Sequence, residues 1–482
     1  MQIAFVFFDV NTGYAPSLHH GLAYLFGALG SAGHQVVLFH VTTDAEMEAA
    51  ARQIQVNGFP IVALSIVTNQ KRHAKRFLAQ LATKPKLLVA GGVHTTLVKE
   101  EAFLDFARLD GVCIGEGEGP LLELVDRFAQ DLDVTMTAGF YFRRGDQIIK
   151  NPVPPLQAVD NLSPPDYSPF NVAKIVHENA FTYPMMLGRG CPYTCSYCCN
   201  HAIRAVYPNT GQYVRLPSVS RAMATIKSNL LLVPETKRIV FSDDTFTFNK
   251  TWLSEFCETY RKDIGLPFIC NARVETICEQ SVDALKAAGC VSIDFGVETG
   301  NEWLRYQVLS RRHSNQKIRE AFALVQKKGI RTFSFNIVGL PLETKEMAKD
   351  TLRLNREIRP NFGKCFYFFP FPGSRIYKLC EELGLLPDDA EEVSGYLEKP
   401  VLKQVFMSDA DTRVAFEKLQ AFFYARLLLS RAPLPRRAER LLSSVMVTAR
   451  KPLLWAINPT NPNPIVRNLR RAARGLALRY LR

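Results

Sequence analysis

Two blocks of alternating apolar and helical segments constrain the fold of this chain most strongly. In the first block the apolar runs lie near residues 3–8, 36–40, 61–66, 87–92 and 111–115. Helical patterns separate them near residues 19–32, 43–55, 70–82 and 98–107. Strands that alternate with helices of this length form βαβ units and a parallel sheet. We therefore expect an α/β, doubly wound domain over residues 1–150, ending in a hairpin over 137–150.

The second block repeats the alternation six times. Its strand-like runs lie at residues 184–190, 238–244, 267–273, 291–300, 332–340 and 364–373. Six repeats predict a partial (β/α)6 barrel over residues 179–385. Between the blocks, residues 151–178 form a linker stiffened by six prolines, which lack amide donors and restrict φ: Pro152, Pro154, Pro155, Pro164, Pro165 and Pro169. Residues 386–482 are expected to be a helical extension, with helices near 411–431 and 434–450.

The composition is that of a globular protein, with 47% hydrophobic and 22% charged residues. The first residues, MQIAFVFFDV, have no signal-peptide pattern, and the chain contains no apolar run of about 18 residues. We therefore expect a cytoplasmic protein. In that compartment the 11 cysteines are thiols or metal ligands and not disulfides.

Positive charge is concentrated at the C-terminus. Of the net charge of +13, residues 426–482 contribute +12, with 13 Lys and Arg and a single acidic residue. Such an extension suggests an anionic partner. Over residues 465–482 apolar and arginine side chains take opposite helical faces, which fits a helix lying on the inner face of a membrane. A basic helix packed on the barrel is the alternative. We do not expect nucleic acid, because aromatic residues are few there.

The cysteines in GRGCPYTCSYCCN raise the question of what they hold. Cys191, Cys195 and Cys198 follow a C-x3-C-x2-C spacing, with Cys199 alongside. A structural zinc site needs four ligands, and no second Cys or His pair follows, although Cys199 or His201 could be recruited. A redox C-x-x-C pair would leave Cys191 idle. An iron-sulfur cluster on three thiolates would keep one iron open, and an open site is useful at the carboxyl edge of barrel strands, where substrates bind.

Other polar residues and glycines also follow strands. Six polar residues lie near the carboxyl ends of barrel strands: Asp243, Asp244, Arg273, Glu298, Asn336 and Glu343. They could take part in the reaction at this end of the barrel, or they could form ordinary ion pairs at its rim. In the first block, glycines cluster after two consecutive strands, at Gly91, Gly92, Gly115, Gly117 and Gly119. Such turns predict a ligand-binding sheet edge.

The segment GRGCPYTCSYC resembles the cluster loop of the radical S-adenosylmethionine superfamily, including Tyr197. The resemblance extends through SDDTF, GVETG, NIVGLPLET and FPFPGS, over residues 181 to about 385. It implies a 4Fe-4S cluster on Cys191, Cys195 and Cys198, whose open iron binds S-adenosylmethionine and generates a 5′-deoxyadenosyl radical.

The same resemblance assigns roles around the cofactor. Asp243 and Asp244 correspond to the stretch that receives the amino group, Glu298 to the ribose contact, and Val338 with Gly339 to the turn that supports adenine. Arg273 is a further candidate contact. Leu342 departs from the small residue usual after GLP. We expect Cys199 to be a spectator, because adjacent side chains on a loop point apart; an alternative ligand is the other possibility.

Residues 1–135 resemble the Rossmann-like cobalamin-binding domain that precedes many such barrels. The matching segments are HHGLAYLFGALGSAGHQVVLF, VALSIVTNQ, LLVAGGVHTT and IGEGEGP. The usual D-x-H-x-x-G motif is missing, and Asn11 stands near the expected histidine. We therefore expect cobalamin without a protein imidazole ligand. The candidate corrin contacts are Ser65, Thr68, Gly91, Gly92 and Gly115.

Together the two resemblances imply a cobalamin-dependent C-methyltransferase. It would methylate an unactivated carbon of a hydrophobic or natural-product-like small molecule, lipid-like if the tail binds membrane, and would need a reductant such as flavodoxin or ferredoxin. A cyclase, rearrangement or oxidative enzyme that uses cobalamin without methyl transfer is the alternative. A cobalamin sensor is disfavoured by the cysteine triad.

Overall fold

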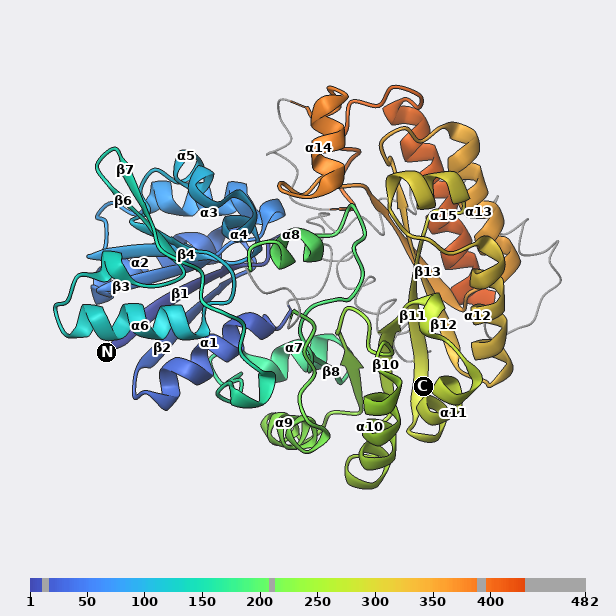
Figure 1. The fold of residues 1–482 in the computed structure, drawn as a ribbon, viewed down its shortest axis with the longest axis horizontal. Helices are drawn as coiled ribbons and strands as arrows, with labels where there is room; N and C mark the ends of the chain where they lie inside the picture. The colour runs from blue at the N-terminus through green and yellow to red at the C-terminus, as the bar shows by residue number, and fades with distance from the viewer. Residues whose placement is uncertain (11–16, 208–212, 388–395, 430–482) are drawn as a thin grey trace.

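The computed structural model describes residues 1–10, 17–207, 213–387 and 396–429, which form two α/β halves built on two sheets (Figure 1). The first sheet has seven strands in the order β2-β1-β3-β4-β5-β6-β7, and the second has six in the order β13-β12-β11-β10-β9-β8. The fold class expected from the sequence is therefore confirmed.

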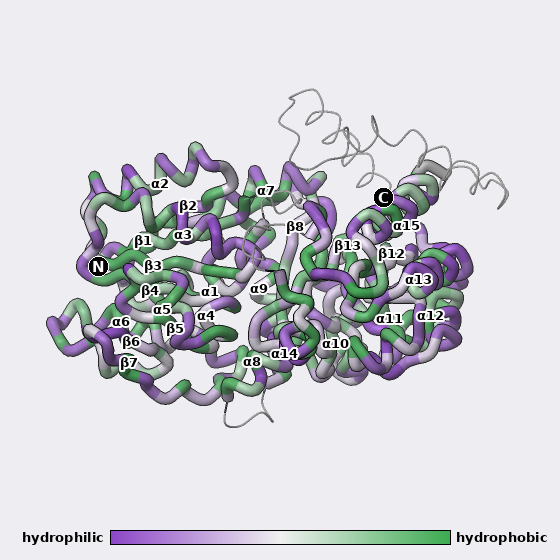
Figure 2. The backbone as a smooth tube through the Cα atoms, turned by 90° about the horizontal axis from the view of Figure 1, so that it is seen from above, coloured by the Kyte–Doolittle hydropathy of each residue, from purple (hydrophilic) through white to green (hydrophobic). Residues whose placement is uncertain are grey.

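The N-terminal half is a doubly wound sheet whose apolar strands are covered on both faces. Five strands pair in parallel: β1 (Gln2–Phe8), β2 (Gln35–Val41), β3 (Ile61–Ser65), β4 (Leu87–Gly91) and β5 (Gly111–Cys113). An antiparallel hairpin, β6 (Phe140–Arg144) and β7 (Gln147–Lys150), completes the sheet. The helices are α1 (His20–Ser31), α2 (Asp44–Asn57), α3 (Lys71–Gln80), α4 (Val93–Val98), α5 (Ala102–Asp105) and α6 (Glu118–Ala129). In Figure 2 the hydrophobic strands β1 and β3 lie beside the more hydrophilic α2.

The helix expected over 98–107 differs from prediction. The chain forms two short helices, α4 and α5, separated by a 3-10 turn at Lys99–Glu101. Lys99 has φ +52, outside the right-handed helical region, which explains why one continuous helix does not form. The linker over 151–178 also carries more structure than its prolines indicate, because it ends in α7 (Val172–Glu178).

The C-terminal half is an open barrel of six parallel strands in sequence order. They are β8 (Thr182–Met185), β9 (Arg238–Phe241), β10 (Phe268–Ala272), β11 (Cys290–Glu298), β12 (Arg331–Val338) and β13 (Phe362–Tyr367). The helices are α8 (Asn200–Arg204), α9 (Val219–Leu232), α10 (Lys250–Asp263), α11 (Glu279–Ala287), α12 (Asn315–Lys327), α13 (Lys345–Ile358), α14 (Arg375–Glu382) and α15 (Asp409–Leu429). In the described part of the chain, β8 and β13 are the edge strands, so the predicted partial barrel is confirmed.

Strand alternation separates a helix-covered face of the barrel from its inner face. Along β12 every second residue is buried, and the residues between them, Phe333, Phe335 and Ile337, are only half-buried. The buried set includes Asn336 and Val338, with Asn336 bonded to Asn355 on α13. Phe333, Phe335 and Ile337 therefore lie on the inner face.

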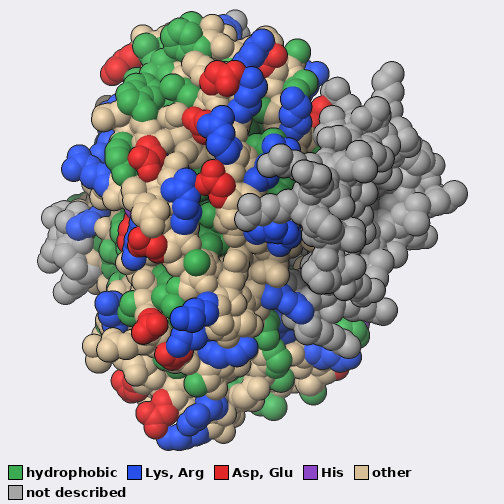
Figure 3. Space-filling view, turned by 90° about the vertical axis from the view of Figure 1, so that its right-hand side faces the viewer, with side chains coloured by type: hydrophobic (Ala, Val, Ile, Leu, Met, Phe, Trp, Pro, Cys, Tyr) green, Lys and Arg blue, Asp and Glu red, His purple; other side chains and the backbone are tan. Residues whose placement is uncertain are grey.

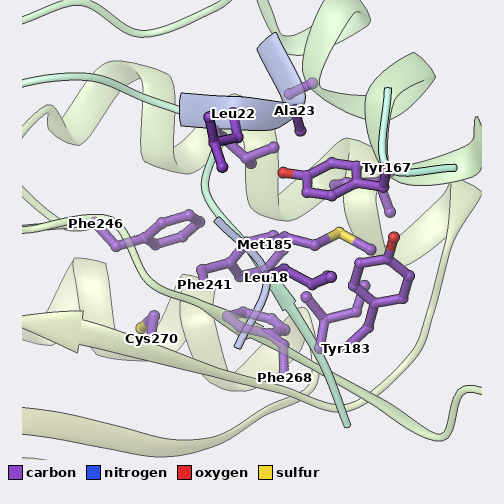
Figure 4. Packing of buried hydrophobic residues seen from close by; sticks show 14 of the residues in the cluster. Leu18, Leu22, Ala23, Tyr167, Tyr183, Met185, Phe241, Phe246, Phe268 and Cys270 are labelled. Carbon is purple, nitrogen blue, oxygen red and sulfur yellow. The ribbon is translucent and has the colours of Figure 1, made fainter. Parts of the chain in front are cut away.

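One apolar core joins the two halves. Leu18, just before α1, and Leu22, in its first turn, belong to the same buried cluster as Tyr183 and Met185 of β8 and Phe241 of β9 (Figure 4). Tyr167 of the linker belongs to the same cluster, and its hydroxyl oxygen lies at hydrogen-bond distance, 2.7 Å, from His20 Nδ1. The halves are thus held by packing as well as by the chain. The domain boundaries at 150, 178 and 385 stay predictions.

Other predictions concern the molecular surface and the C-terminus. The helix expected over 411–431 corresponds to α15, whereas Asn11, the 434–450 helix and the basic helix over 465–482 lie outside the described residues. Within the described chain no helix is both long and apolar enough to span a membrane. Charged side chains of both signs are interspersed over the barrel surface seen in Figure 3.

Candidate functional site

A residue that follows the second barrel strand holds the start of the cysteine loop in place. Asp243, two residues after the end of β9, accepts hydrogen bonds from the backbone amides of Gly188 at 2.6 Å and Leu187 at 3.2 Å. Asp243 is buried, and this burial raises the pKa of its carboxyl to about 6. The two carboxylate oxygens are therefore engaged in holding the loop.

The far end of the loop is held by segments that follow two other strands. Ser196 donates its amide to Leu309 O at 3.1 Å, and its own carbonyl accepts the amide of Ile376 in α14 at 3.1 Å. The Ser196 hydroxyl also donates to Val308 O. The cysteines thus sit on a braced loop at the carboxyl ends of the barrel strands.

Each cysteine of the triad has a different polar neighbour. Cys191 Sγ lies 3.7 Å from Thr245 Oγ1, Cys195 Sγ accepts from Arg273 Nη1 at 3.0 Å, and Cys198 Sγ accepts from Asn200 Nδ2 at 3.6 Å. All three thiols are free. Hydrogen-bond donors and positive charge stabilise thiolates, which are the form that binds metal.

Cys198 differs from an ordinary thiol in its pKa. Its neighbours Cys199 and Asn200 lower the pKa of Cys198 to about 7. The expected spectator role of Cys199 stays a prediction.

The donor set of the cysteine loop can be compared with the needs of an iron-sulfur cluster. In a 4Fe-4S cluster each thiolate binds a different iron, so three thiolates leave one iron open. The donor set, three free thiols with Arg273 beside Cys195, fits an anionic cluster of this kind.

Arg273 is the centre of a charged network at the barrel mouth. Its guanidinium lies 3.7 Å from the ring centroid of Tyr193 and pairs with Glu275, which also bonds His313 Nδ1 at 3.0 Å. These partners hold the pKa of Glu275 well below its usual range. The network fixes the orientation of Arg273 toward Cys195.

Glu298 ties the end of β11 to the cysteine loop. It follows a bulge in the pairing with β12 and has φ +62. Its Oε1 accepts from Tyr197 Oη at 2.9 Å and from Arg311 Nη1 at 3.2 Å. The predicted ribose contact is thus adjacent to the loop and already has two partners.

Asp244 differs from Asp243 in its exposure. It is exposed and accepts from Asn200 Nδ2 at 3.0 Å, and Asn200 in turn accepts from Tyr213 Oη at 2.7 Å. Of the two aspartates predicted to receive the amino group, Asp244 is therefore the one with a carboxylate open to a ligand.

The predicted adenine turn is braced from within. Gly339 has φ +78, and the carboxylate of Glu343 accepts the amides of Gly339 at 2.6 Å and Leu340 at 3.3 Å. Burial raises the pKa of Glu343 to about 8. Asn336, in contrast, bonds Asn355 on the helix-covered face, so its expected place at the mouth is wrong.

The candidate corrin contacts share the carboxyl edge of the seven-stranded sheet. Ser65 and Gly91 are register partners at the ends of β3 and β4, and Thr68 Oγ1 lies 3.3 Å from His94 Nδ1. At Gly92, with φ +109, an added Cβ would lie 2.7 Å from Ile66 O. At Gly115, with φ +86, it would lie 2.5 Å from Tyr207 Oη. The edge therefore requires glycine and permits close approach, as a bulky cofactor needs.

His19 is an imidazole at this edge that sequence reasoning missed. Its Nδ1 accepts the amide of Leu22 at 3.0 Å as the cap of α1, so the neutral ring carries its proton on Nε2, which lies 3.3 Å from Ser65 Oγ. Burial lowers the pKa of His19 to about 4. This ring is therefore a hydrogen-bond donor, and the expectation of cobalamin without a protein imidazole ligand stays a prediction.

Two family models match the chain. The radical SAM superfamily model covers residues 185–354, and the B12 binding domain model covers residues 12–125. An uncharacterized methyltransferase of Pyrococcus horikoshii is 25% identical over 362 residues, 74% of this chain and 77% of that protein. The anaerobic magnesium-protoporphyrin IX monomethyl ester cyclase of Rubrivivax gelatinosus is 24% identical over 425 residues, 85% and 74% of the two chains.

Solved structures share the fold. The cobalamin-dependent S-adenosylmethionine radical enzyme OxsB, with aqua-cobalamin bound, superposes with a TM-score of 0.69 at 16% identity, covering 98% of this chain and 75% of that one. The radical S-adenosylmethionine methyltransferase TsrM from Kitasatospora setae, with tryptophan and a S-adenosylmethionine analog, gives 0.63 at 14% identity, covering 79% and 76%. The chain therefore carries a B12 binding domain followed by a radical SAM domain, the domain pair of cobalamin-dependent radical SAM enzymes, whose cofactors are a 4Fe-4S cluster, S-adenosylmethionine and cobalamin.

Proposed function

We propose that the protein is a C-methyltransferase that transfers a methyl group from methylcobalamin to an unactivated carbon of a hydrophobic small molecule. One observation carries this proposal: the corrin edge and the cluster loop lie against each other. Tyr207, a few residues after the triad, bonds the amide of Glu116 at 2.7 Å and packs on Gly115, and α4 lies against α8. The methyl donor and the radical generator would then both face the same substrate-binding space.

When bound, the cluster and S-adenosylmethionine supply a carbon radical that can remove hydrogen from an unactivated C–H bond, and cobalamin supplies the methyl group. The chain's own residues position these groups. Arg273 and Asn200 stabilise the thiolates of Cys195 and Cys198, Asp244 offers a carboxylate to the amino group, and Glu343 braces the adenine turn. Ser65, Thr68, Gly91, Gly92 and Gly115 would hold the corrin, and a flavodoxin or ferredoxin would supply electrons.

The inner face of the barrel favours an apolar, flat substrate. Phe333, Phe335 and Phe366 are half-buried there, and the rings of Phe335 and Phe366 stack with centroids 6.1 Å apart. Two similar proteins are named for tetrapyrrole chemistry, the cyclase above and a bacteriochlorophyllide d methyltransferase of Chlorobaculum tepidum, 22% identical. We propose a conjugated, hydrophobic substrate of this kind, reached in the cytoplasm or at the membrane surface.

The test is a product analysis of anaerobically reconstituted enzyme, given reductant, S-adenosylmethionine, methylcobalamin and extract from a strain that lacks the gene. We expect both 5′-deoxyadenosine and S-adenosylhomocysteine, and a metabolite heavier by one CH2 group. With trideuteromethyl S-adenosylmethionine, the label should appear in that metabolite. Enzyme that forms 5′-deoxyadenosine but never S-adenosylhomocysteine would contradict methyl transfer.

A second candidate is a cyclase or oxidative enzyme that uses cobalamin without methyl transfer. The specific observation in its favour is the match to the cyclase of Rubrivivax gelatinosus over 85% of this chain. It predicts a product that has lost hydrogen or gained oxygen, needs cobalamin, and carries no label from the trideuteromethyl donor.

A further inference from the structure

We propose that Glu116, Glu118, Arg189 and Arg215 form an interdomain clamp that sets the distance between the bound corrin and the cluster. Glu116 and Glu118 belong to the GEGEG turn after β5, and Arg189 precedes Cys191 by two residues. The purpose of the clamp rests on the proposed function, but its existence as a positioning device does not depend on methyl transfer.

The clamp consists of two guanidinium groups on two carboxylates. Arg189 pairs with Glu118 Oε1 and lies 3.1 Å from Glu116 Oε1. Arg215 contacts both oxygens of Glu116, with Nη1 3.1 Å from Oε2. Two positive and two negative groups therefore meet, and paired guanidinium–carboxylate bonds are directional.

Burial makes these pairs different from surface ion pairs. The side chains of Arg215, Glu118 and Arg189 are 8%, 10% and 15% exposed, and that of Glu116, which both arginines contact, is 27% exposed. The Arg189 guanidinium also lies 4.5 Å from the ring centroid of Tyr24, on α1 of the N-terminal half. Exposed ion pairs contribute little, whereas a buried charge that loses its partner is strongly disfavoured. The four side chains should therefore keep one relative position.

Short backbone paths connect the clamp to both candidate cofactor sites. Arg189 and Arg215 exchange backbone hydrogen bonds of 2.8 and 2.9 Å, which fixes the segment that leads into Cys191. At the other end, Glu116 directly follows Gly115, whose amide donates to Thr96 Oγ1 at 3.0 Å. A shift of the carboxylates would thus move the corrin edge relative to the cysteine loop.

The apolar core between the halves does not fulfil this role. It includes Leu22 and Met185 and holds the halves together, but apolar packing has little directional preference. The clamp instead specifies orientation at the edge nearest the two cofactors. The apolar core therefore holds the two halves together, whereas the clamp sets their relative orientation.

The test measures the distance between two unpaired electrons, on cob(II)alamin and on the reduced cluster, by pulsed dipolar EPR of the loaded protein without substrate. The variants are Glu116→Gln with Glu118→Gln, and Arg189→Lys, which keeps the charge but loses the fork. Glu123→Gln is the matched control, because Glu123 lies on the same helix as Glu118 and pairs with Arg127 at a partly exposed site.

We expect wild type and Glu123→Gln to give the same narrow distance distribution. The Gln pair should broaden or shift it beyond the wild-type width, and Arg189→Lys should do so to a smaller extent, with iron and corrin contents unchanged. Unchanged distributions would overturn the proposal. Loss of iron or corrin from both the Gln pair and Arg189→Lys would also overturn it, because the residues would then serve retention. Failure of methyl transfer would leave this distance readout intact, so the two proposals fail separately.

Discussion

Arg273 is the described side chain whose charge acts directly on a triad sulfur. Its Nη1 donates to Cys195 Sγ at 3.0 Å, and Glu275 and Tyr193 hold it there. Reduction adds negative charge to a cluster, so a neighbouring cation and a hydrogen bond to sulfur favour the reduced form and raise the potential.

Arg273→Gln should therefore lower the midpoint potential of the cluster. The charge is lost and Glu275 loses a partner, and both changes disfavour the reduced form. We expect a decrease on the order of 50 mV, equivalent to about 1 kcal/mol for one electron. An EPR-monitored redox titration measures it, with Arg319→Gln, which removes an exposed pair with Glu357, as control. Equal potentials in the two variants would rule out this role.

Alanine substitution of each cysteine separates ligands from neighbours. Cys191→Ala, Cys195→Ala and Cys198→Ala should each lose most of the iron, since each removes one of three thiolate ligands. Cys199→Ala should retain it, because we expect Cys199 to be a spectator and not a ligand. Iron and sulfide analysis of anaerobically purified protein is the measurement. Equal iron loss from Cys199→Ala would make Cys199 a ligand.

At the scale of elements, the turn after β12 depends on a buried acid. Glu343 accepts the amides of Gly339 and Leu340, while its Oε1 has no partner among the described residues. Burial raises its pKa from 4.5 to about 8 in the folded protein. The folded state therefore binds the proton more tightly than the unfolded state.

This shift predicts a pH dependence of stability with a definite sign. The stabilising contribution of protonated Glu343 is full below pH 4.5 and is lost as the pH rises through about 8. The total is about 5 kcal/mol. Between pH 5 and 8, the free energy of unfolding of Glu343→Gln, whose side chain stays neutral, should fall less than that of wild type in denaturant titrations. Glu346→Gln, at an exposed position of α13, is the control. Parallel curves for wild type and Glu343→Gln would contradict the assignment.

The strands of both sheets could be predicted from the sequence because their apolar runs are bounded by turns and helical patterns. The helix boundaries near Lys99 could not, because a single residue with positive φ interrupts the helix. Asn336 was expected among the polar residues at the barrel mouth, but side chains alternate along β12 and Asn336 lies on the helix-covered face. α7 follows a proline-rich stretch that conceals its short helical pattern.

The contacts between the two halves could not be predicted from the sequence. Arg189 and Glu118 lie 71 positions apart, and Tyr207 and Glu116 lie 91 apart. No local pattern indicates such pairs. The GEGEG turn did predict a ligand-binding edge, but the sequence contained no signal that two of its acids hold arginines from the barrel.

At the scale of the whole molecule, the charge asymmetry predicts membrane binding. Residues 426–482 carry +12 of the net +13. The full chain should bind vesicles rich in anionic lipid, more weakly as salt rises, and not vesicles of zwitterionic lipid. Removal of residues 430–482 should abolish binding in a vesicle flotation assay while iron content is retained. Equal flotation after removal would refute the role of the tail.

The central claim is that three thiolates hold a 4Fe-4S cluster with one iron open to S-adenosylmethionine. The most direct measurement is the EPR spectrum of the anaerobically reduced protein before and after addition of S-adenosylmethionine, with metal analysis of the same sample. The account predicts about four irons per chain and a spectrum that changes when S-adenosylmethionine binds. A bound zinc ion, or a cluster spectrum that S-adenosylmethionine leaves unchanged, would contradict it.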